Sequence, residues 1–359
     1  MTSGPATTVL ARPQRRDIAL LRVVAIVGVV AIHVSGLVVT ADALKEKPVW
    51  WLAHVLNSGS RFCVPLFVMV SGALLLRPSR PETAREFFRR RLDRLVPALV
   101  VWYLVYILFT WAVIGTERSV GEVLALVLAG RTYTALYFFW LILGLYLATP
   151  ALRKLLAGLD GPRLLAVGLL LTGLAVADNT TKAFVHRFSD VDTTATPTAL
   201  TYWIPYVGYF VLGAALSHGP VARQVAPWAG GALAVTTTLS VLETTGRTPA
   251  SLGWLAPVDY FGPLVALATV ALFLLGASLL HPVSEPSTGD RVVGTLGGLT
   301  LGVFAVHLIV LYGLQRVVVD QGVVPRSVPA LVVLLAGTVT LSFAVAWVLS
   351  RVPGLRRLV

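Results

Sequence analysis

The sequence has 359 residues, of which 56% are hydrophobic and only 13% carry a formal charge. Soluble domains carry about 25% charged residues, so this composition excludes an ordinary soluble protein and predicts a multi-pass membrane protein. The formal net charge of +12 does not indicate nucleic acid, because the basic residues lie in short segments between apolar runs, where they orient membrane helices.

The first apolar run, residues 18–40, contains two unusual side chains, Arg22 and His33. Eleven residues are close to three helical turns, so both lie on one helix face, about 16 Å apart along the axis. A charge at the centre of a membrane helix costs about 2.5–3.5 kcal/mol on insertion scales, so such residues usually serve a function. His33 is suited to act as a general base, because imidazole titrates near neutral pH. The structural alternative is an arginine that reaches the headgroups and a histidine hydrogen-bonded inside the bundle.

Runs of about 20 apolar residues predict an all-α fold, a polytopic transmembrane bundle of about ten helices. The expected spans are roughly 18–40, 50–76, 93–114, 122–149, 163–177, 199–217, 226–242, 256–280, 294–318 and 328–350. Residues 120–130 leave open a short separate helix before the fourth span. In the second span Pro65 predicts a kink, and Ser71-Gly72 predicts a close helix contact. The sequence contains no evident internal repeat, which disfavours transporter folds built from two related halves.

The connecting segments differ in charge. The basic ones are the N-terminal tail, loop 77–92, loop 150–163 and the C-terminal tail with Arg351, Arg356 and Arg357. The longest polar loop, 178–198, is weakly charged, so the positive-inside rule places it outside and both termini in the cytoplasm. We therefore expect a cell-membrane protein with a cytoplasmic tail (1–17), a membrane domain (18–350) and a second cytoplasmic tail (351–359).

Arg91 and Arg94 precede the third span and are spaced i, i+3, which puts both guanidinium groups on one face of a helix start. Arginine pairs bind phosphates well, through bidentate hydrogen bonds that lysine cannot form. A phosphorylated cytosolic ligand is one interpretation. The other is a cluster of charge that only orients the helix.

The rest of the chain has few residues typical of chemical sites. His307 lies in the ninth span, where an isolated histidine is more often a hydrogen-bonded core residue than a ligand. Asp259 and Glu243 are expected at the outward ends of spans, in contact with solvent. The sequence has no metal-ligand spacing, no glycine-rich phosphate loop and no G-x-S-x-G turn, so we predict no metal cofactor.

Several of these segments together resemble the acyltransferase 3 family of integral membrane acyltransferases. The similarity comprises Arg22 and His33 in an Arg-x10-His pair, the segments IHVS and VPLFVMVSGALLL, the pair Arg91 and Arg94, GLYLATP in the fourth span and LGxxTLGVFAVH in the ninth. Two positions differ from the family pattern. Ala135-Leu136-Tyr137-Phe138 stands where a His-Leu-Trp-Phe stretch is common, and Leu308 replaces a proline after the ninth-span histidine.

The resemblance implies an O-acyltransferase that transfers groups other than amino-acyl groups. It implies acyl-coenzyme A as donor, with acetyl-coenzyme A expected, and a hydroxyl of a carbohydrate, lipid-linked or other exported acceptor. His33 would be the catalytic histidine, with Arg22 as its partner on the same helix. Arg91 and Arg94 would help to hold the coenzyme A phosphates. Direct transfer and an acyl-histidine intermediate both stay open, and Ser71 and Tyr137 are candidate oxyanion donors.

Two other functions fit part of the pattern. A transporter or flippase of a glycan or lipid would use Arg22 and His33 as substrate or proton-relay residues. That function gives no reason for Arg91 and Arg94. A non-catalytic membrane scaffold leaves His33 unexplained.

Overall fold

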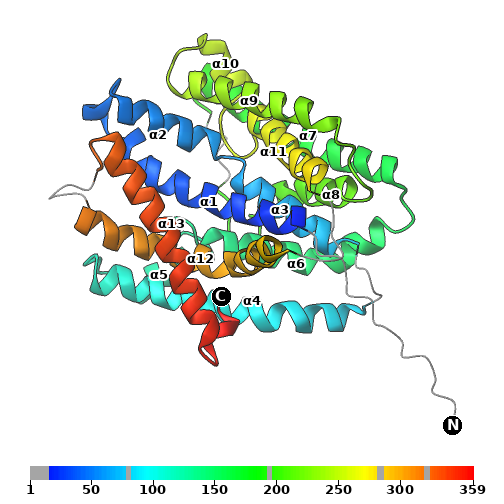
Figure 1. Cartoon of the computed structure of the whole chain (residues 1–359), viewed down its shortest axis with the longest axis horizontal. Coiled ribbons are helices and arrows are strands. Elements are labelled where there is room, and N and C mark those ends of the chain that lie inside the picture. Colours follow the sequence, from blue (N-terminus) through cyan, green and yellow to red (C-terminus); the bar gives the residue numbers. More distant parts are fainter. Residues whose placement is uncertain (1–15, 78–81, 192–195, 281–286, 319–323) are drawn as a thin grey trace.

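The computed structural model describes residues 16–77, 82–191, 196–280, 287–318 and 324–359. Over these residues the chain is all-α, as predicted, and contains no strand (Figure 1). Its helices are α1 Arg16–Val39, α2 Pro48–Gly59, α3 Cys63–Leu75, α4 Ala84–Ala112, α5 Val120–Leu128, α6 Tyr137–Leu155, α7 Gly161–Phe188, α8 Val207–Leu216, α9 Val225–Thr244, α10 Ala250–Leu255, α11 Pro263–Leu279, α12 Thr288–Val318 and α13 Val328–Arg351. Three short 3-10 helices are η1 Asp42–Leu44, η2 Ile204–Tyr206 and η3 Leu355–Arg357. Most of the predicted N-terminal tail and part of loop 77–92 lie outside the described residues.

Eight helical stretches among the described residues are long and apolar enough to cross a membrane. They are α1, α2 together with α3, α4, α6, α7, α9, α12 and α13. Two shorter apolar helices, Ile204–Leu216 and Pro263–Leu279, lie within the predicted spans 199–217 and 256–280. The chain is therefore a multi-pass membrane protein, and the predicted bundle is confirmed.

Helix α1 lies at the centre of the bundle, in contact with α2, α3, α11, α12 and α13 (Figure 1). It runs parallel to α12, as contacts near the start of both helices indicate. Arg16, the first residue of α1, forms an ion pair with Asp290 in the first turn of α12. Further along, Gly297 of α12 lies close to Ala19 of α1. The polar residues of α1 therefore lie among other helices.

Helices α3 and α8 approach each other closely at two glycines. A Cβ atom on Gly72 would lie 1.8 Å from the carbonyl oxygen of Phe210, and one on Gly213 would lie 1.8 Å from that of Met69. Any side chain at either position would push the helices apart. The close contact predicted at Ser71-Gly72 is thus confirmed, and it fixes the position of α3.

The second span is interrupted where the sequence predicted a kink. Helix α2 ends at Gly59 and α3 begins at Cys63, so the break precedes Pro65. Proline has no N–H to donate to the carbonyl oxygen of Arg61, four residues earlier, and its ring would clash with that carbonyl. A helix that begins at Cys63 needs no donor at Pro65, because the first-turn N–H groups have no partner within a helix.

The fourth span predicted at 122–149 is wrong at its start, and the alternative left open, a short separate helix at 120–130, is confirmed. Val120–Leu128 forms the separate helix α5, which begins with a capping box between Ser119 and Glu122. After α5, Gly130 has a φ of +66°, a left-handed conformation that ends the helix. The fourth span is therefore α6, Tyr137–Leu155.

Two predicted loops are partly helical. Helix α4 begins at Ala84 because Thr83 and Glu86 form a capping box, so most of the arginines expected in loop 77–92 lie on its first turns. Helix α7 continues to Phe188, so the predicted loop 178–198 is shorter than expected. Asp178 and Lys182 form an i, i+4 ion pair of 2.6 Å on this helical extension.

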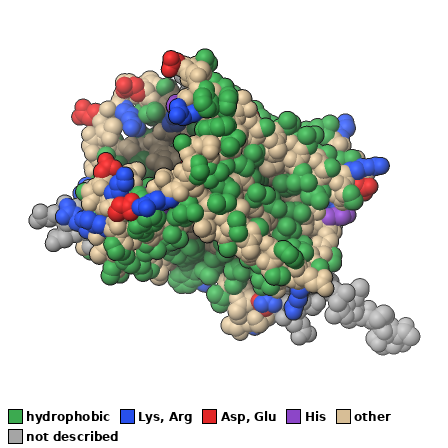
Figure 2. Space-filling view, turned by 90° about the horizontal axis from the view of Figure 1, so that it is seen from above, with side chains coloured by type: hydrophobic (Ala, Val, Ile, Leu, Met, Phe, Trp, Pro, Cys, Tyr) green, Lys and Arg blue, Asp and Glu red, His purple; other side chains and the backbone are tan. Residues whose placement is uncertain are grey.

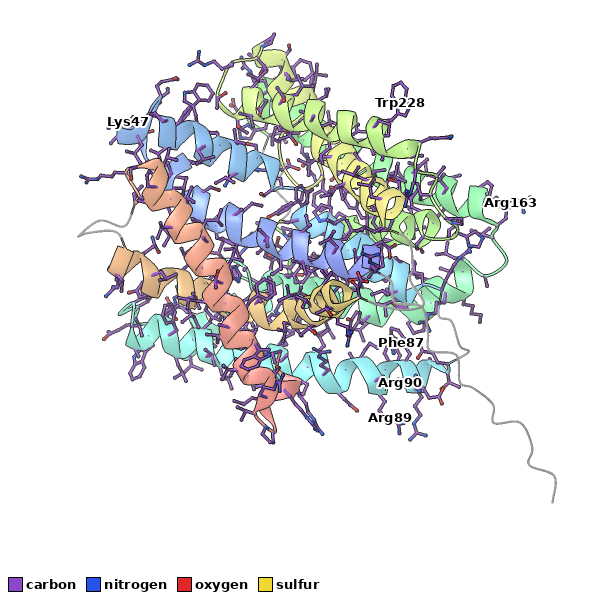
Figure 3. The ribbon with its side chains drawn as sticks, in the orientation of Figure 1. Lys47, Phe87, Arg89, Arg90, Arg163 and Trp228 are labelled. Carbon is purple, nitrogen blue, oxygen red and sulfur yellow. The ribbon has the colours of Figure 1, made fainter. Side chains whose placement is uncertain are left out.

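The two ends of the bundle can be followed in the figures. Figure 3 shows Lys47 at one end and Arg89, Arg90 and Arg163 at the other. In the space-filling view, apolar side chains cover the middle of the face, while charged side chains gather toward the ends (Figure 2). We refer to the two ends as the Lys47 end and the arginine end.

Candidate active site

Arg22 and His33 lie beside different cavities. Arg22 lines a cavity of about 290 Å³ toward the arginine end, which we call the arginine cavity. His33 lines another cavity, of about 720 Å³, which we call the His33 cavity. Gly36 and Leu37, near the end of α1 that leads to Lys47, also line the His33 cavity, as do the loop residues Thr134 and Pro197. One helix, α1, therefore supplies a polar residue to each cavity.

Four arginines line the arginine cavity: Arg22 from α1 and Arg90, Arg91 and Arg94 from α4. Arg22 donates a hydrogen bond of 3.0 Å to Thr300 Oγ1 on α12. The helical spacing of Arg91 and Arg94 directs both side chains to this cavity, as the sequence pattern suggested. The structure adds Arg22 and Arg90 to the pair.

Glu82, which precedes α4, contacts two of these arginines and the neighbouring Arg153. Its carboxylate accepts a hydrogen bond of 2.9 Å from Arg153 Nη2 and lies 3.4 Å from Arg91 Nη1 and 3.6 Å from Arg90 Nη1. The guanidinium groups of Arg91 and Arg153 also lie over the buried Phe87 ring, 4.8 and 4.7 Å from its centroid. One carboxylate balances only one of three positive charges, so the cavity stays positively charged.

A further cavity of about 750 Å³ adjoins the arginine cavity, and Arg90 and Arg94 line both. We call it the tail cavity, because residues of the C-terminal segment line it. Its other charged residues are Arg89, Asp93, Arg356 and Arg357. Arg94 donates a hydrogen bond to the main-chain oxygen of Val359, which holds the segment against α4. Five arginines and one aspartate therefore line this cavity.

His33 lies next to a second histidine, His307 of α12, with the ring centroids 5.3 Å apart. His307 is fully buried, and its Nδ1 lies 2.7 Å from the carbonyl oxygen of Phe304. A carbonyl only accepts hydrogen bonds, so Nδ1 carries the hydrogen and Nε2 of the neutral ring is an acceptor. That Nε2 has no hydrogen-bond partner within the described part of the chain. His307 is therefore not the fully hydrogen-bonded core residue that its isolated position in the sequence suggested.

The remaining walls of the His33 cavity combine aromatic and polar groups. Arg61 donates a hydrogen bond of 3.3 Å to Asn57 Oδ1. Asp259, expected to contact solvent, is half-buried and accepts hydrogen bonds from Asn179 Nδ2 and from the backbone N–H of Phe261. The tyrosines that line the cavity are Tyr137, Tyr202, Tyr206 and Tyr260. Such a wall presents both apolar ring faces and hydrogen-bonding groups to a ligand.

The two candidate oxyanion donors fall in different cavities. Tyr137 lines the His33 cavity. Ser71 lines the arginine cavity, and its hydroxyl donates a hydrogen bond of 2.8 Å to the carbonyl oxygen of Phe67. The geometry therefore favours Tyr137 over Ser71 as a group near His33.

Of the residues that α12 contributes, sequence reasoning missed Thr300 and set His307 aside as a core residue. Thr300 and His307 are seven residues apart, close to two helical turns, so they share the face that packs on α1. Thr300 contacts Arg22, and His307 contacts His33. The seven-residue spacing of two polar residues in an apolar helix was the available signal.

Comparison with known proteins identifies a family for the chain. A family model described as an acyltransferase domain, that of the acyltransferase 3 family, matches residues 15–349. No curated protein and no solved structure matches the chain.

Proposed function

Because the chain belongs to the acyltransferase 3 family, we propose that it transfers an acyl group from acyl-coenzyme A, with acetyl-coenzyme A expected, to a hydroxyl of a carbohydrate, cell-envelope or exported acceptor. One observation carries this proposal: the tail cavity, the arginine cavity and the His33 cavity adjoin in that order through shared lining residues. A donor bound by its phosphates at the arginine end could extend toward the histidine.

The arginine end supports a phosphorylated donor. Coenzyme A carries a diphosphate and a 3′-phosphate, joined to the thiol by a flexible arm. Arginine forms strong charge-assisted hydrogen bonds with phosphate oxygens. Arg91 and Arg94 would bind phosphates of the donor, and Arg90 and the tail-segment arginines would add positive charge around its nucleotide. Arg22 would then meet the arm where it enters the bundle.

His33 would act as the general base. Its neutral imidazole removes the proton from the acceptor hydroxyl as the oxygen attacks the thioester carbonyl carbon. The new carbon–oxygen bond forms and the carbon–sulfur bond breaks. The leaving thiolate then takes the proton from the imidazolium, so coenzyme A departs as the thiol. An acyl-histidine intermediate, in which the imidazole itself attacks, is the alternative route.

His307 would act as a positioning residue. The unpaired Nε2 of His307 can accept the ring N–H of His33, which would keep the other nitrogen of His33 free to take a proton. We expect His307→Ala to lower kcat about tenfold, the effect of one lost hydrogen bond, with both KM values little changed. His307→Gln, which retains an acceptor, should recover part of kcat. Steady-state kinetics of the three proteins would check this, and equal losses in both variants would contradict a hydrogen-bonding role.

The His33 cavity supports a polyhydroxylated acceptor. A carbohydrate has apolar C–H faces that stack on aromatic rings and hydroxyls that need directional partners. The tyrosines would provide the ring faces, and Arg61 and Asp259 would provide a donor and an acceptor on the same wall.

The proposed orientation follows the distribution of charge. The positive-inside rule places the arginine end in the cytoplasm, and with it the site for the donor. The His33 cavity would then be reached from the outside of a cell membrane. The donor would stay on the cytoplasmic side, and only its acyl group would cross to the acceptor.

Sealed vesicles of known orientation test this proposal. Acyl-coenzyme A labelled in the acyl group is added on the side of the arginine end, and candidate glycans are confined to the opposite side. We expect label on the glycan and free coenzyme A on the donor side. Transfer only when both substrates share the donor side would refute the through-membrane geometry while keeping the enzyme.

A transporter or flippase is the second candidate. Two cavities on either side of a narrow region, each with a polar residue of α1, would also suit a protein that opens alternately to the two sides. The same vesicles separate the two candidates. Movement of the unmodified glycan across the membrane, with no acyl transfer from any donor, would favour the transporter.

A further inference from the structure

Three phenylalanines separate the arginine cavity from the His33 cavity. Phe67 of α3, Phe138 of α6 and Phe304 of α12 each line both cavities, and no other described residue does so. The ring centroids of Phe67 and Phe138 are 5.7 Å apart, and those of Phe138 and Phe304 are 4.9 Å apart. Their exposed fractions are only 9%, 8% and 6%. The rings therefore contact one another at the boundary between the two cavities.

The backbone around these rings is well fixed. Helix α3 is held against α8 by the close contacts at Gly72 and Gly213. On α12, the carbonyl oxygen of Phe304 lies 2.7 Å from His307 Nδ1, and that of Ala305 accepts a hydrogen bond of 2.9 Å from Tyr106. Rotation of the phenyl rings is therefore an easier way to open the boundary than movement of the helices.

We propose that Phe67, Phe138 and Phe304 form a gate through which the thioester end of the donor reaches His33, and that this gate restricts the enzyme to short, uncharged acyl groups. The proposal rests on the proposed function. With the gate closed, the rings separate the two cavities. When the rings rotate aside, the width of the passage is limited to the space that the three phenyl groups vacate.

The chemistry of the rings explains both restrictions. Each added methylene must displace packed aromatic atoms, and a tight apolar site typically discriminates about 10-fold to 200-fold per methylene. A carboxylated acyl group such as succinyl would lose the hydration of its charge among three phenyl rings, which carry no group to compensate it. Acetyl-coenzyme A would pass most readily.

The closed gate would also protect the donor. Water enters the His33 cavity more readily than an apolar boundary, and water that reached the thioester would compete with the acceptor. A gate that opens only around the donor arm keeps the thioester away from His33, and so from water that His33 could activate, until transfer. It also keeps small ions from crossing between two cavities that extend toward opposite ends of the bundle.

The neighbouring Phe139 offers a matched control. It is fully buried, and its ring centroid lies 5.5 Å from that of Phe304, yet it lines neither cavity. Its truncation should disturb packing to a similar degree without widening the boundary. Phe138→Leu and Phe139→Leu provide a milder pair in case the alanine variants fail to fold.

The experiment uses the full-length protein in proteoliposomes. Release of free coenzyme A is measured with acetyl-, butyryl-, hexanoyl- and succinyl-coenzyme A, in the presence of a glycan that the wild type acylates. We expect Phe138→Ala to raise the hexanoyl-to-acetyl rate ratio by at least about tenfold, and Phe67→Ala and Phe304→Ala to act in the same direction. Phe139→Ala should keep the wild-type ratio.

A second measurement does not depend on activity. Proton permeability of the same proteoliposomes, followed with a trapped pH-sensitive dye and no substrates, should rise for the gate variants and stay at the wild-type value for Phe139→Ala. If folded gate variants keep both the wild-type donor ratio and the wild-type permeability, the gate is refuted. If the wild type releases coenzyme A from no donor, the proposed function fails, and the permeability still decides whether the three rings seal the boundary.

Discussion

Replacing His33 with alanine is expected to abolish acyl transfer while the protein still inserts and folds. Loss of a general base typically costs about 10²–10⁴ in rate. The structural cost should be small, because within the described residues His33 makes a ring contact with His307 and no side-chain hydrogen bond. Label transfer from acyl-coenzyme A to a glycan would be measured at saturating concentrations of both substrates, so that the loss appears in kcat.

His54 of α2 provides the control for this experiment. It is also a buried histidine in a membrane helix, but it lines neither the arginine cavity nor the His33 cavity. Its Nδ1 lies 3.4 Å from Thr244 Oγ1, so its truncation removes at least as much packing and hydrogen bonding as that of His33. We expect His54→Ala to keep most of the activity. Near-normal activity of His33→Ala would end its assignment as the base.

The double variant Arg91→Ala, Arg94→Ala is expected to raise the KM for acyl-coenzyme A strongly and the KM for the acceptor little. Each charged hydrogen bond to a phosphate contributes about 1.5–3 kcal/mol. The loss of each arginine should therefore raise the KM for acyl-coenzyme A roughly tenfold or more. Lysine at either position should restore only part of the affinity, because it cannot form the bidentate contact. Initial rates over a grid of donor and acceptor concentrations would give both KM values.

Two comparisons make this prediction specific to phosphate binding. Arg163 lies at the same end of the bundle (Figure 3), has a side chain 73% exposed and lines none of the three cavities, so Arg163→Ala should leave both KM values unchanged. Acyl-pantetheine, which lacks the phosphates, should bind the wild type and the double variant equally weakly. A rise in the acceptor KM instead would assign the arginines another role.

The sequence predicts the polar positions of the site better than their surroundings. Helical spacing alone puts Arg22 and His33 on one face, and Arg91 and Arg94 on another. It cannot reveal that Arg22 lines the same cavity as Arg91 and Arg94, because these residues lie about 70 positions apart in sequence and their proximity depends on how α1 and α4 are placed in the bundle. For the same reason the neighbour of His33 was missed, since periodicity identifies a face but not the helix that covers it.

The errors in the predicted spans also have a local cause. Hydropathy detects apolar runs but is insensitive to what starts and ends a helix. The capping boxes at Thr83 and Ser119 begin α4 and α5 within segments that hydropathy assigned to a loop and to a longer span. Gly130, with its positive φ, ends the segment after α5. Capping signals should therefore be read together with hydropathy wherever polar residues interrupt an apolar run.

The contacts of Glu82 have a thermodynamic consequence for ligand binding. A free arginine side chain loses up to about 2 kcal/mol of conformational entropy when it is fixed by a ligand. Arg91 and Arg153 are already fixed, by the carboxylate of Glu82 on one side and by the ring of Phe87 on the other. Much of this entropy is therefore lost during folding rather than on association. Glu82 thus lowers the net charge of the cluster, and it also lowers the entropy cost of binding an anion there, because it keeps the cations preorganised.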